Sequence, residues 1–454
     1  MSRDLLALAL ANGAIVAAGH GVLRLAGIRP AARDLAWSVA IAYLAGAAAF
    51  GVLGSAALVL GLALDWWQIL AGCALLFVVG LCWNNTSARR GRQPSGIEEA
   101  CVGTTQALRG PLLLLPVAVI TVLAVLAVDL AVQPIWTDDA WSIWAAKASS
   151  LAVLDGLDSA YLSSASVFSA SYPLVVPVLE LVPLRFAGFP NELIPLQLGL
   201  LFVAFPFALA ALLRDRVNAL VLWVVLLAVA VAPTLQIQAA SAVADVPLAV
   251  FFALAGVAGW RWVELGEDSM LWLAGIFAAA TVGAKVEGGL FVALLFVALA
   301  VAGARYRRPL RRFGLVAAAV VLSALPWELW SRIHSLEDAV SAAGELSPGG
   351  LGRIPSATGS MLRELADPSS WLVLVALAAV AVALALARRS GREAALFTSF
   401  VTLASLVALL LVYWATPLDF DYHVATSVRR VIVAPVLFAV AMTPLLLSRA
   451  QRSR

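Results

Sequence analysis

Charged residues are scarce in this chain. Of its 454 residues, 13% are Asp, Glu, Lys or Arg, whereas 63% are hydrophobic. Soluble domains contain about 25% charged residues, and a helix of about 20 apolar residues is enough to cross a bilayer. Because the apolar runs repeatedly reach that length, the composition excludes a soluble domain. It predicts an all-α polytopic membrane protein in contact with membrane lipids.

Cysteine and histidine are scarce as well. Cys73, Cys82 and Cys101 lack the spacing of metal ligands. The sequence therefore supports neither a disulfide framework nor a zinc site, and it leaves a divalent metal cofactor open. No phosphate-binding loop, dinucleotide fingerprint or nucleophile elbow occurs, so ATP-driven transport and hydrolase chemistry gain no support. No nucleic-acid partner is expected.

The apolar runs predict about 11 to 13 transmembrane helices. The candidate spans are 5–24, 37–62, 67–84, 110–133, 192–213, 217–233, 244–262, 271–284, 288–303, 313–331, 370–387, 395–415 and 431–448. The span at 271–284 is short, so 271–303 is expected to be a helix pair. The first three spans predict an N-terminal membrane extension at 1–109, followed by a main module at 110–448 and a basic tail at 449–454.

The arginines orient these spans. Most lie in short basic segments on one side, namely "RRGR" (89–92), "RDR" (214–216), "RYRRPLRR" (305–312), "RRSGR" (388–392) and "RAQRSR" (449–454). Arginine-rich loops face the cytoplasm, which leaves three long outer loops, at about 134–191, 332–369 and 416–430. The Arg- and Ala-rich usage is typical of a GC-rich bacterium. We therefore expect a multi-pass protein of the cytoplasmic (inner) membrane, with its site facing the periplasm or cell exterior.

The first outer loop contains "TDDAWSIWAAKA" (137–148). Thr137 is a good N-cap, which predicts a short helix from Asp138 at the membrane interface. Asp138 and Asp139 are either residues that favour a helix N-terminus or the acids of a site. Lys147 lies about 12 Å along the helix from Asp139. A sugar joined to a phosphate has a comparable length.

Aromatic and proline residues mark the rest of this loop. Trp136, Trp141 and Trp144 are expected at the interface, where tryptophan is enriched. Further on, "SASYPLVVPVLELVPLRFAGFPNE" (169–192) holds Tyr172 and several prolines. Closely spaced prolines predict short segments packed on the membrane surface.

Ionisable residues also interrupt the apolar spans. Asp245 stands at the mouth of the seventh span, and Lys285 and Glu287 interrupt a long apolar region. Such groups at membrane depth are costly and are functional candidates by default. The alternatives are a helix cap at Asp245 and a structural salt bridge between Lys285 and Glu287.

The last outer loop, "TPLDFDYHVATSVRR", holds His423, Arg429 and Arg430 just before the final span. Arginine is suited to bidentate phosphate binding, and two arginines on the outer side run against the positive-inside trend. Anchoring beside the membrane is the alternative role.

Several motifs together carry a resemblance. They are, in order, "TDDAW", "YPLVVP", "ADVPLA", "GAKVEGG", "LPWELW" (325–330) and "HVATSVRR". Over 110–448 the chain resembles the GT-C class of polytopic glycosyltransferases, which includes protein O-mannosyltransferases and lipid A aminoarabinose transferases. It differs in having three spans before the acidic loop, where many members have one, and an Asp-Asp pair where several branches have Asp-Glu.

The resemblance implies an inverting transferase that moves a sugar from a polyprenyl-phosphate donor to a lipid, glycan or protein acceptor, with Asp138 or Asp139 as the base. From chemistry and placement we assign the other candidates. Those for the donor phosphate are Lys147, Lys285, Arg429, Arg430 and His423, and those for the acceptor or substrate are Tyr172, Asp245, Glu287 and Trp141.

Two other functions compete with this one. A transporter or flippase of a lipid-linked or small anionic substrate would explain charges at membrane depth, but it predicts internal repeats, and none is apparent. A non-catalytic membrane scaffold would explain only the tryptophans and arginines.

Overall fold

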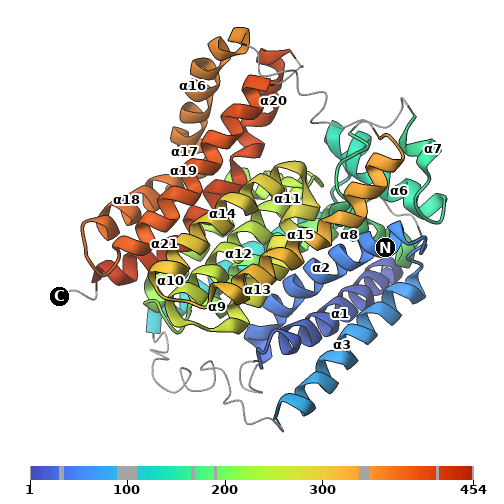
Figure 1. Cartoon of the computed structure of the whole chain (residues 1–454), viewed down its shortest axis with the longest axis horizontal. Helices are drawn as coiled ribbons and strands as arrows, with labels where there is room; N and C mark the ends of the chain where they lie inside the picture. Colours follow the sequence, from blue (N-terminus) through green and yellow to red (C-terminus); the bar gives the residue numbers. More distant parts are fainter. Residues whose placement is uncertain are drawn as a thin grey trace.

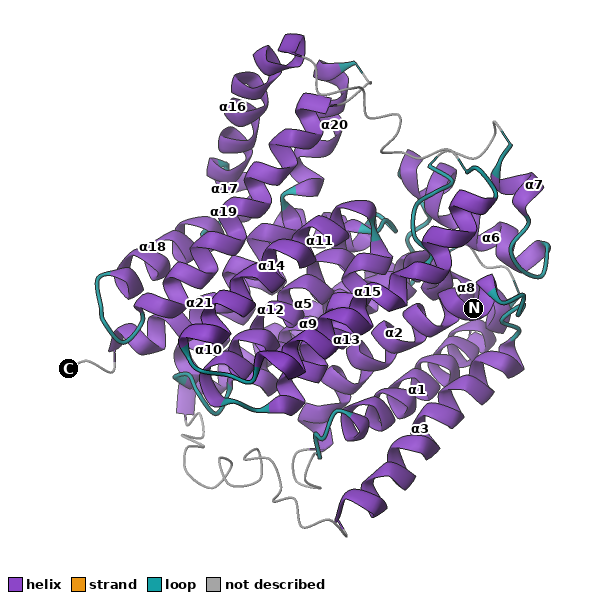
Figure 2. Cartoon of the chain, viewed as in Figure 1, coloured by secondary structure: helices purple, strands orange, loops and turns teal. Residues whose placement is uncertain are grey.

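The computed structural model describes residues 2–29, 35–88, 110–164, 169–188, 192–336, 348–415 and 419–451. Within these ranges every regular element is a helix (Figure 2). Nine helices of the described residues are long and apolar enough to cross a membrane, or ten if one bent pair is a single span. The prediction of an all-α polytopic membrane protein is confirmed.

The helices occupy the predicted spans. Those long enough to cross a membrane are α1 (Ser2–Leu25), α2 (Leu35–Val59), α3 (Trp66–Ala88), α9 (Leu193–Leu213), α12 (Asp245–Leu265), α14 (Val286–Arg305), α15 (Leu310–Ile333), α19 (Arg392–Ala415), and α20 (Phe420–Val431) joined to α21 (Val433–Gln451). Shorter apolar helices are α5 (Leu114–Leu130), α13 (Asp268–Ala284) and α18 (Leu374–Leu386). The bent pair is α10 (Ala219–Val231) and α11 (Pro233–Ala240), at 55°.

The remaining helices belong to the predicted outer loops. They are η3 (Ala140–Trp144), α6 (Ala145–Val153), α7 (Ser159–Leu162), α8 (Val175–Ala187), η4 (Pro348–Gly352), α16 (Arg353–Ala366) and α17 (Pro368–Trp371). A short turn, η2 (Gly110–Leu113), precedes α5. Figure 1 shows α16 and α20 together, projecting beyond the central helices, with α6 and α7 on the other side at the same end.

Helix α12 is the centre of the bundle. It is apolar on all sides and buried along almost its whole length, with α9, α13, α14 and α21 packed around it. A helix without a polar face is stable only when other helices or lipid surround it. Its first residue, Asp245, is therefore buried as well.

Helices α13 and α14 form the predicted helix pair. Lys285 alone separates them, with extended backbone angles (φ −157°, ψ 155°). Gly288 lets the first turn of α14 lie against α13, because a Cβ there would stand 2.0 Å from the carbonyl oxygen of Thr281. Gly288 thus allows a tight reversal beside a buried lysine.

Arginines gather at the opposite end of the bundle from Asp245. There Arg261 pairs with Asp215 at 3.2 Å, Arg305 with Glu393 at 2.7 Å, and Arg449 with Glu264. Ser390 also donates a hydrogen bond of 3.3 Å to the Arg449 carbonyl. These contacts bring the segments at 214–216, 305–312 and 388–392 and the start of the C-terminal tail to one end. The basic segment at 89–92 and Cys101 lie outside the described residues.

The N-terminal helices share the core of the main module. Helix α1 packs against α2 and α3, and α2 packs against α8, α9, α13 and α15. The side chain of Asn12 in α1 donates a hydrogen bond of 2.9 Å to Gln197 in α9. The extension predicted at 1–109 is therefore joined to the rest by buried contacts.

Helix α8 corrects one prediction. Its prolines predicted short segments on the membrane surface, but it is a helix of 13 residues, buried from Val175 to Leu184. Pro177 lies in the first turn, where a backbone amide needs no partner within the helix. Val175 and Val178 contact Gly51 and Gly54 of α2, whose missing side chains make room for α8. Tertiary packing outweighs the effect of the prolines.

The two glycines at the start of α14 give a matched test. We expect Gly288→Ala to lower the melting temperature of the purified protein, because the new methyl group must displace the Thr281 carbonyl, at a cost of about 1–3 kcal/mol. A methyl group added at Gly289 would have no neighbouring atom within 4 Å, so Gly289→Ala should match or exceed the wild type, since alanine favours helix by about 1 kcal/mol. Equal melting temperatures for the two variants would contradict the close approach.

Candidate functional site

Five of the predicted site residues meet in one ion network. Arg430 contacts Asp139 at 2.6 Å through Nη1 and Asp245 at 3.1 Å through Nε. Lys285 contacts the other oxygen of Asp245 at 2.9 Å and Glu287 at 3.4 Å. The four segments that provide these residues are far apart in the sequence. Each was predicted separately, and the fold brings them together.

Helix ends place the members of the network. Asp245 is the first residue of α12, Lys285 is the break between α13 and α14, and Arg430 lies in the last turn of α20. Asp245 and Lys285 are buried, while the side chain of Asp139 is 38% exposed. Three carboxylates face two cations, so the network has one net negative charge. Of the two structural alternatives, the salt bridge between Lys285 and Glu287 is present, whereas Asp245 does not cap α12, whose N-cap is Ala244 without a side-chain hydrogen bond.

Arg430 has hydrogen-bonding capacity to spare. Its Nε and one Nη1 hydrogen are directed at carboxylates, and its Nη2 has no partner among the residues that the structure describes. A guanidinium has five N–H donors in a planar fork. A further oxyanion can therefore bind Arg430 without displacing the buried Asp245.

The start of the first outer loop is fixed beside this network. Thr137 Oγ1 accepts a weak bond of 3.4 Å from the Ala140 amide, which confirms the predicted cap, and it donates a bond of 2.8 Å to the carbonyl of Ser241. The indole of Trp136 donates to the Ala240 carbonyl at 3.2 Å. These bonds dock the loop on the connection between α11 and α12, a few residues before Asp245.

The acidic pair divides into two environments. Asp139 belongs to the network, whereas Asp138 is exposed and has no ion pair within the described ranges. Trp141 is exposed and donates to the Ile135 carbonyl at 3.0 Å, within its own loop. Trp144 ends the π-helical turn at 140–144 and is buried against Tyr172, so its predicted place at the interface is wrong.

Lys147 has a different environment from the one predicted. It is buried, and its Nζ donates to the carbonyls of Ser169, Ala170 and Tyr172 at 3.0, 2.7 and 2.8 Å. Burial lowers the pKa of Lys147 to about 7, but the three acceptors oppose that shift, since only the ammonium form has three hydrogens to donate. These bonds use all three, so none remains for a donor phosphate. Lys147 is a positioning residue for the loop at 169–172.

Trp327 completes this clamp on the loop. Its indole donates to the Ser171 carbonyl at 2.9 Å, and its ring lies 5.6 Å from Lys147 Nζ. Lys147 and Trp327 thus bind four successive carbonyls. Trp327 was not among the predicted site residues, although it stands in the "LPWELW" motif. Only its place in that motif could have pointed to Trp327, because the residue has no charge and no informative spacing from other candidates.

The clamped loop presents Tyr172 to the ion network. The ring of Tyr172 packs on Trp144 at 5.4 Å between centroids. Burial, reinforced by the negative charge of Glu287, raises the pKa of Tyr172 to about 12. The phenol is therefore a hydrogen-bond donor at neutral pH and does not serve as a base.

His423 and Arg429 lie beside the network and have other partners. The ring of His423 packs on Tyr413 at 5.2 Å. Arg429 binds Glu364 of α16 at 2.8 Å and lies 3.9 Å from Asp367. The structure thus shows Arg429 joining α16 to α20, where a donor-phosphate contact was predicted.

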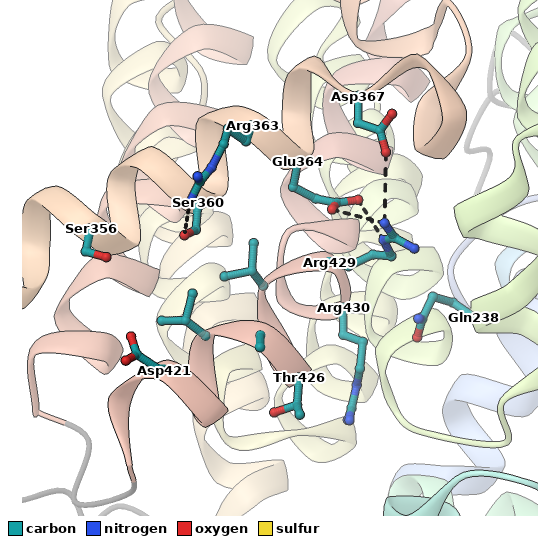
Figure 3. A pocket seen from close by; sticks show the side chains of 13 residues that line it. Gln238, Ser356, Ser360, Arg363, Glu364, Asp367, Asp421, Thr426, Arg429 and Arg430 are labelled. Carbon is teal, nitrogen blue, oxygen red and sulfur yellow. Dashed lines mark hydrogen bonds and ion pairs between the residues drawn. The ribbon is translucent and has the colours of Figure 1, made fainter.

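A pocket of about 850 Å³ lies between α16 and α20 (Figure 3). Figure 3 shows Ser360 and Arg363 on the α16 wall and Thr426 and Arg430 on the α20 wall. Arg430 therefore belongs to both the pocket and the ion network. Sequence reasoning missed the α16 wall, because serines and arginines on an amphipathic helix are typical of any exposed helix.

The described residues contain no group of three or more His, Cys, Asp or Glu side chains that could hold a metal ion. The carboxylates of the ion network instead have cationic side chains as partners.

Comparison of the chain with protein-family models, curated proteins and solved structures gives no match in any of the three. Function is therefore inferred from the site and from the sequence motifs.

The clamp on the loop at 169–172 can be tested by hydrogen exchange. We expect Lys147→Met to speed amide exchange across 169–174 and to reduce the free energy of unfolding by about 3 kcal/mol, because three carbonyls lose their donor. Trp327→Phe, which removes one hydrogen bond, should reduce it by about 1 kcal/mol. Unchanged exchange in Lys147→Met would show that the loop is held by other contacts.

The buried pair in the network can be tested by a double-mutant cycle. Lys285→Met should destabilise the protein by about 3 kcal/mol, because it leaves Asp245 under-compensated in the core. Adding Asp245→Asn removes that charge, so the double variant should recover part of the loss in thermal unfolding. If the two losses simply added, Lys285 and Asp245 would not be energetically coupled.

Proposed function

We propose that the protein is a membrane glycosyltransferase that moves a sugar from a polyprenyl-phosphate donor to an acceptor hydroxyl, with inversion at the anomeric carbon. The observation that supports this most is the contact of Asp139, a loop acid, with Arg430, an arginine that still has open donors. A transferase of this kind needs a carboxylate for the acceptor and a cation for the leaving phosphate at one place. The order of the motifs that resemble GT-C enzymes agrees with these roles.

Exposure decides which carboxylate the donor phosphate replaces. The side chain of Asp139 is 38% exposed, whereas that of Asp245 is 2% exposed and also held by Lys285. Moving Asp245 off Arg430 would leave a buried charge with fewer partners, which is costly. The phosphate therefore binds Arg430 at Nη2 and takes the place of Asp139 at Nη1. This exchange frees the Asp139 carboxylate for the acceptor.

In the transfer step, the acceptor oxygen forms a bond to the anomeric carbon as the bond from that carbon to the phosphate oxygen breaks. The leaving polyprenyl phosphate keeps the bonding electron pair and is stabilised by Arg430. The hydroxyl proton passes to Asp139. Lys285 acts through Asp245, which fixes the position of Arg430.

The charge distribution gives the orientation in this proposal. The arginine-rich end lies in the cytoplasm by the positive-inside rule, so the ion network faces the outside of the cytoplasmic membrane. In a bacterium this is the periplasm or the cell exterior. A lipid-linked sugar at the outer leaflet then reaches Arg430 with its tail still in the bilayer.

A transporter or flippase is the second candidate, and the bent helix pair α10–α11 favours it. The pair bends by 55° at a break, and transporters bind their substrates at such broken helices. A transporter moves the lipid-linked sugar intact, whereas a transferase releases polyprenyl phosphate. The two are separated by product analysis.

The two aspartates give a matched test of the transferase. In nanodiscs with polyprenyl-phosphate sugars and crude envelope acceptors, Asp139→Asn should reduce polyprenyl phosphate release by about 100-fold or more, the usual contribution of a positioned base. Asp138→Asn, one residue away and outside the network, should reduce it by less than about tenfold. If Asp138→Asn caused the larger loss, Asp138 and not Asp139 would be the base. Wild-type release unaffected by either change would remove the acids from the mechanism.

A further inference from the structure

The pocket between α16 and α20 is connected to the ion network through Arg430, and Arg430 is the one lining residue to which the proposed donor chemistry gives a role. Its volume of about 850 Å³ is large for a single small ligand group and lies near the upper end of the usual range for ligand sites, about 300–1,000 Å³. A molecule bound there would reach past Arg430 to Asp139. The pocket therefore has the position of an acceptor site.

The lining excludes an apolar ligand. Of the described residues that line the pocket, only Val424, Ala425 and Val428 are apolar, and the two valines are themselves buried. A lipid tail gains its binding energy from apolar contact. Such a tail would leave the polar groups of both walls without water or partners, which is unfavourable.

The charges of the lining balance. Three arginines and three carboxylates line the pocket together, namely Arg363, Arg429, Arg430, Glu364, Asp367 and Asp421. Arg429 pairs with Glu364 and lies 3.9 Å from Asp367, and Arg430 pairs within the ion network. Arg363 donates to Ser360 at 3.0 Å and has no carboxylate partner in the described ranges, while Asp421 has no cationic partner there. One unpaired cation and one unpaired anion give no preference for a charged ligand.

The uncharged polar residues of the lining come from three helices. Ser356 and Ser360 lie on α16 and Gln238 on α11, and each can both donate and accept. Thr426 on α20 donates its hydrogen to the Tyr422 carbonyl at 2.9 Å and can accept. Gln238 has a side-chain oxygen that is buried and without a hydrogen-bond partner among the described atoms. Sugar hydroxyls have the same dual character, so many of them can be satisfied at once by such a lining.

From these observations we propose that this pocket binds an uncharged oligosaccharide as the acceptor. That the oligosaccharide acts as the acceptor rests on the proposed transferase function. That it binds in this pocket does not depend on that function. A lipid headgroup or a peptide would be a different ligand class, and each is an outcome of the test.

The test is direct binding to the full chain in nanodiscs without any donor. The probes are uncharged tetrasaccharides of mannose, galactose, glucose and arabinose at millimolar concentration, followed by saturation-transfer NMR and calorimetry. We expect at least one to bind the wild type. The double variant Ser360→Ala, Arg363→Ala should weaken that binding about tenfold or more, because two hydrogen-bonding groups are lost.

Matched controls separate the pocket from the rest of the protein. Arg332→Ala removes an exposed arginine of α15 outside this pocket and should leave binding unchanged. The melting temperature of the double variant should equal that of the wild type, since Arg363 is exposed and Ser360 lies on the pocket wall.

The other outcomes overturn the proposal. No binding of any tetrasaccharide, equal binding by the wild type and the double variant, or preferential binding of an acidic oligosaccharide, a peptide, a lipid headgroup or a polyprenyl alcohol would each do so. If a tetrasaccharide binds here but the separate assay with polyprenyl-phosphate sugars shows no release of polyprenyl phosphate, the transferase function falls and the pocket assignment stands.

Discussion

The position of a single buried carboxylate, Asp245, constrains the rest of the site. It begins the central helix α12, so it cannot reach solvent, and an ionised carboxylate there needs both partners that it has. Lys285 can approach it only because α13 and α14 break at that residue, and Arg430 only because α20 ends beside α12. The helix break, the final outer helix and the acidic loop are therefore arranged around one charge.

The first outer loop depends on a second set of bonds. Lys147 and Trp327 hold four successive carbonyls of the loop at 169–172, which keeps Tyr172 next to the network. Thr137 and Trp136 fix the other end of the loop to the connection before α12. These bonds fix the position of Asp139 at the start of the loop, and the role that we propose for it, between an acceptor and a phosphate, requires such precision.

Much of the fold and half of the site could be predicted from sequence. The length of the apolar runs was enough to predict the membrane-spanning helices. The energetic cost of burying charge in a membrane was enough to select Asp245, Lys285 and Glu287 as candidates. Lys147 could not be interpreted correctly, because scarcity in composition does not distinguish a ligand-binding lysine from one bound by backbone carbonyls. Helix α8 was misplaced because prolines report local backbone preference, whereas its burial comes from packing against α1, α2, α6 and α9, with room left by two glycines of α2. The pocket wall on α16 gives no sequence signal of its own.

A structure of the protein in nanodiscs with a polyprenyl-phosphate sugar bound would test the proposed site more directly than any variant. We expect the phosphate within hydrogen-bond distance of Arg430, with Asp139 released from that arginine and turned toward the sugar, while Asp245 still contacts Lys285. A phosphate bound among the arginines at the opposite end of the bundle, with the contact between Arg430 and Asp139 intact, would contradict the proposal.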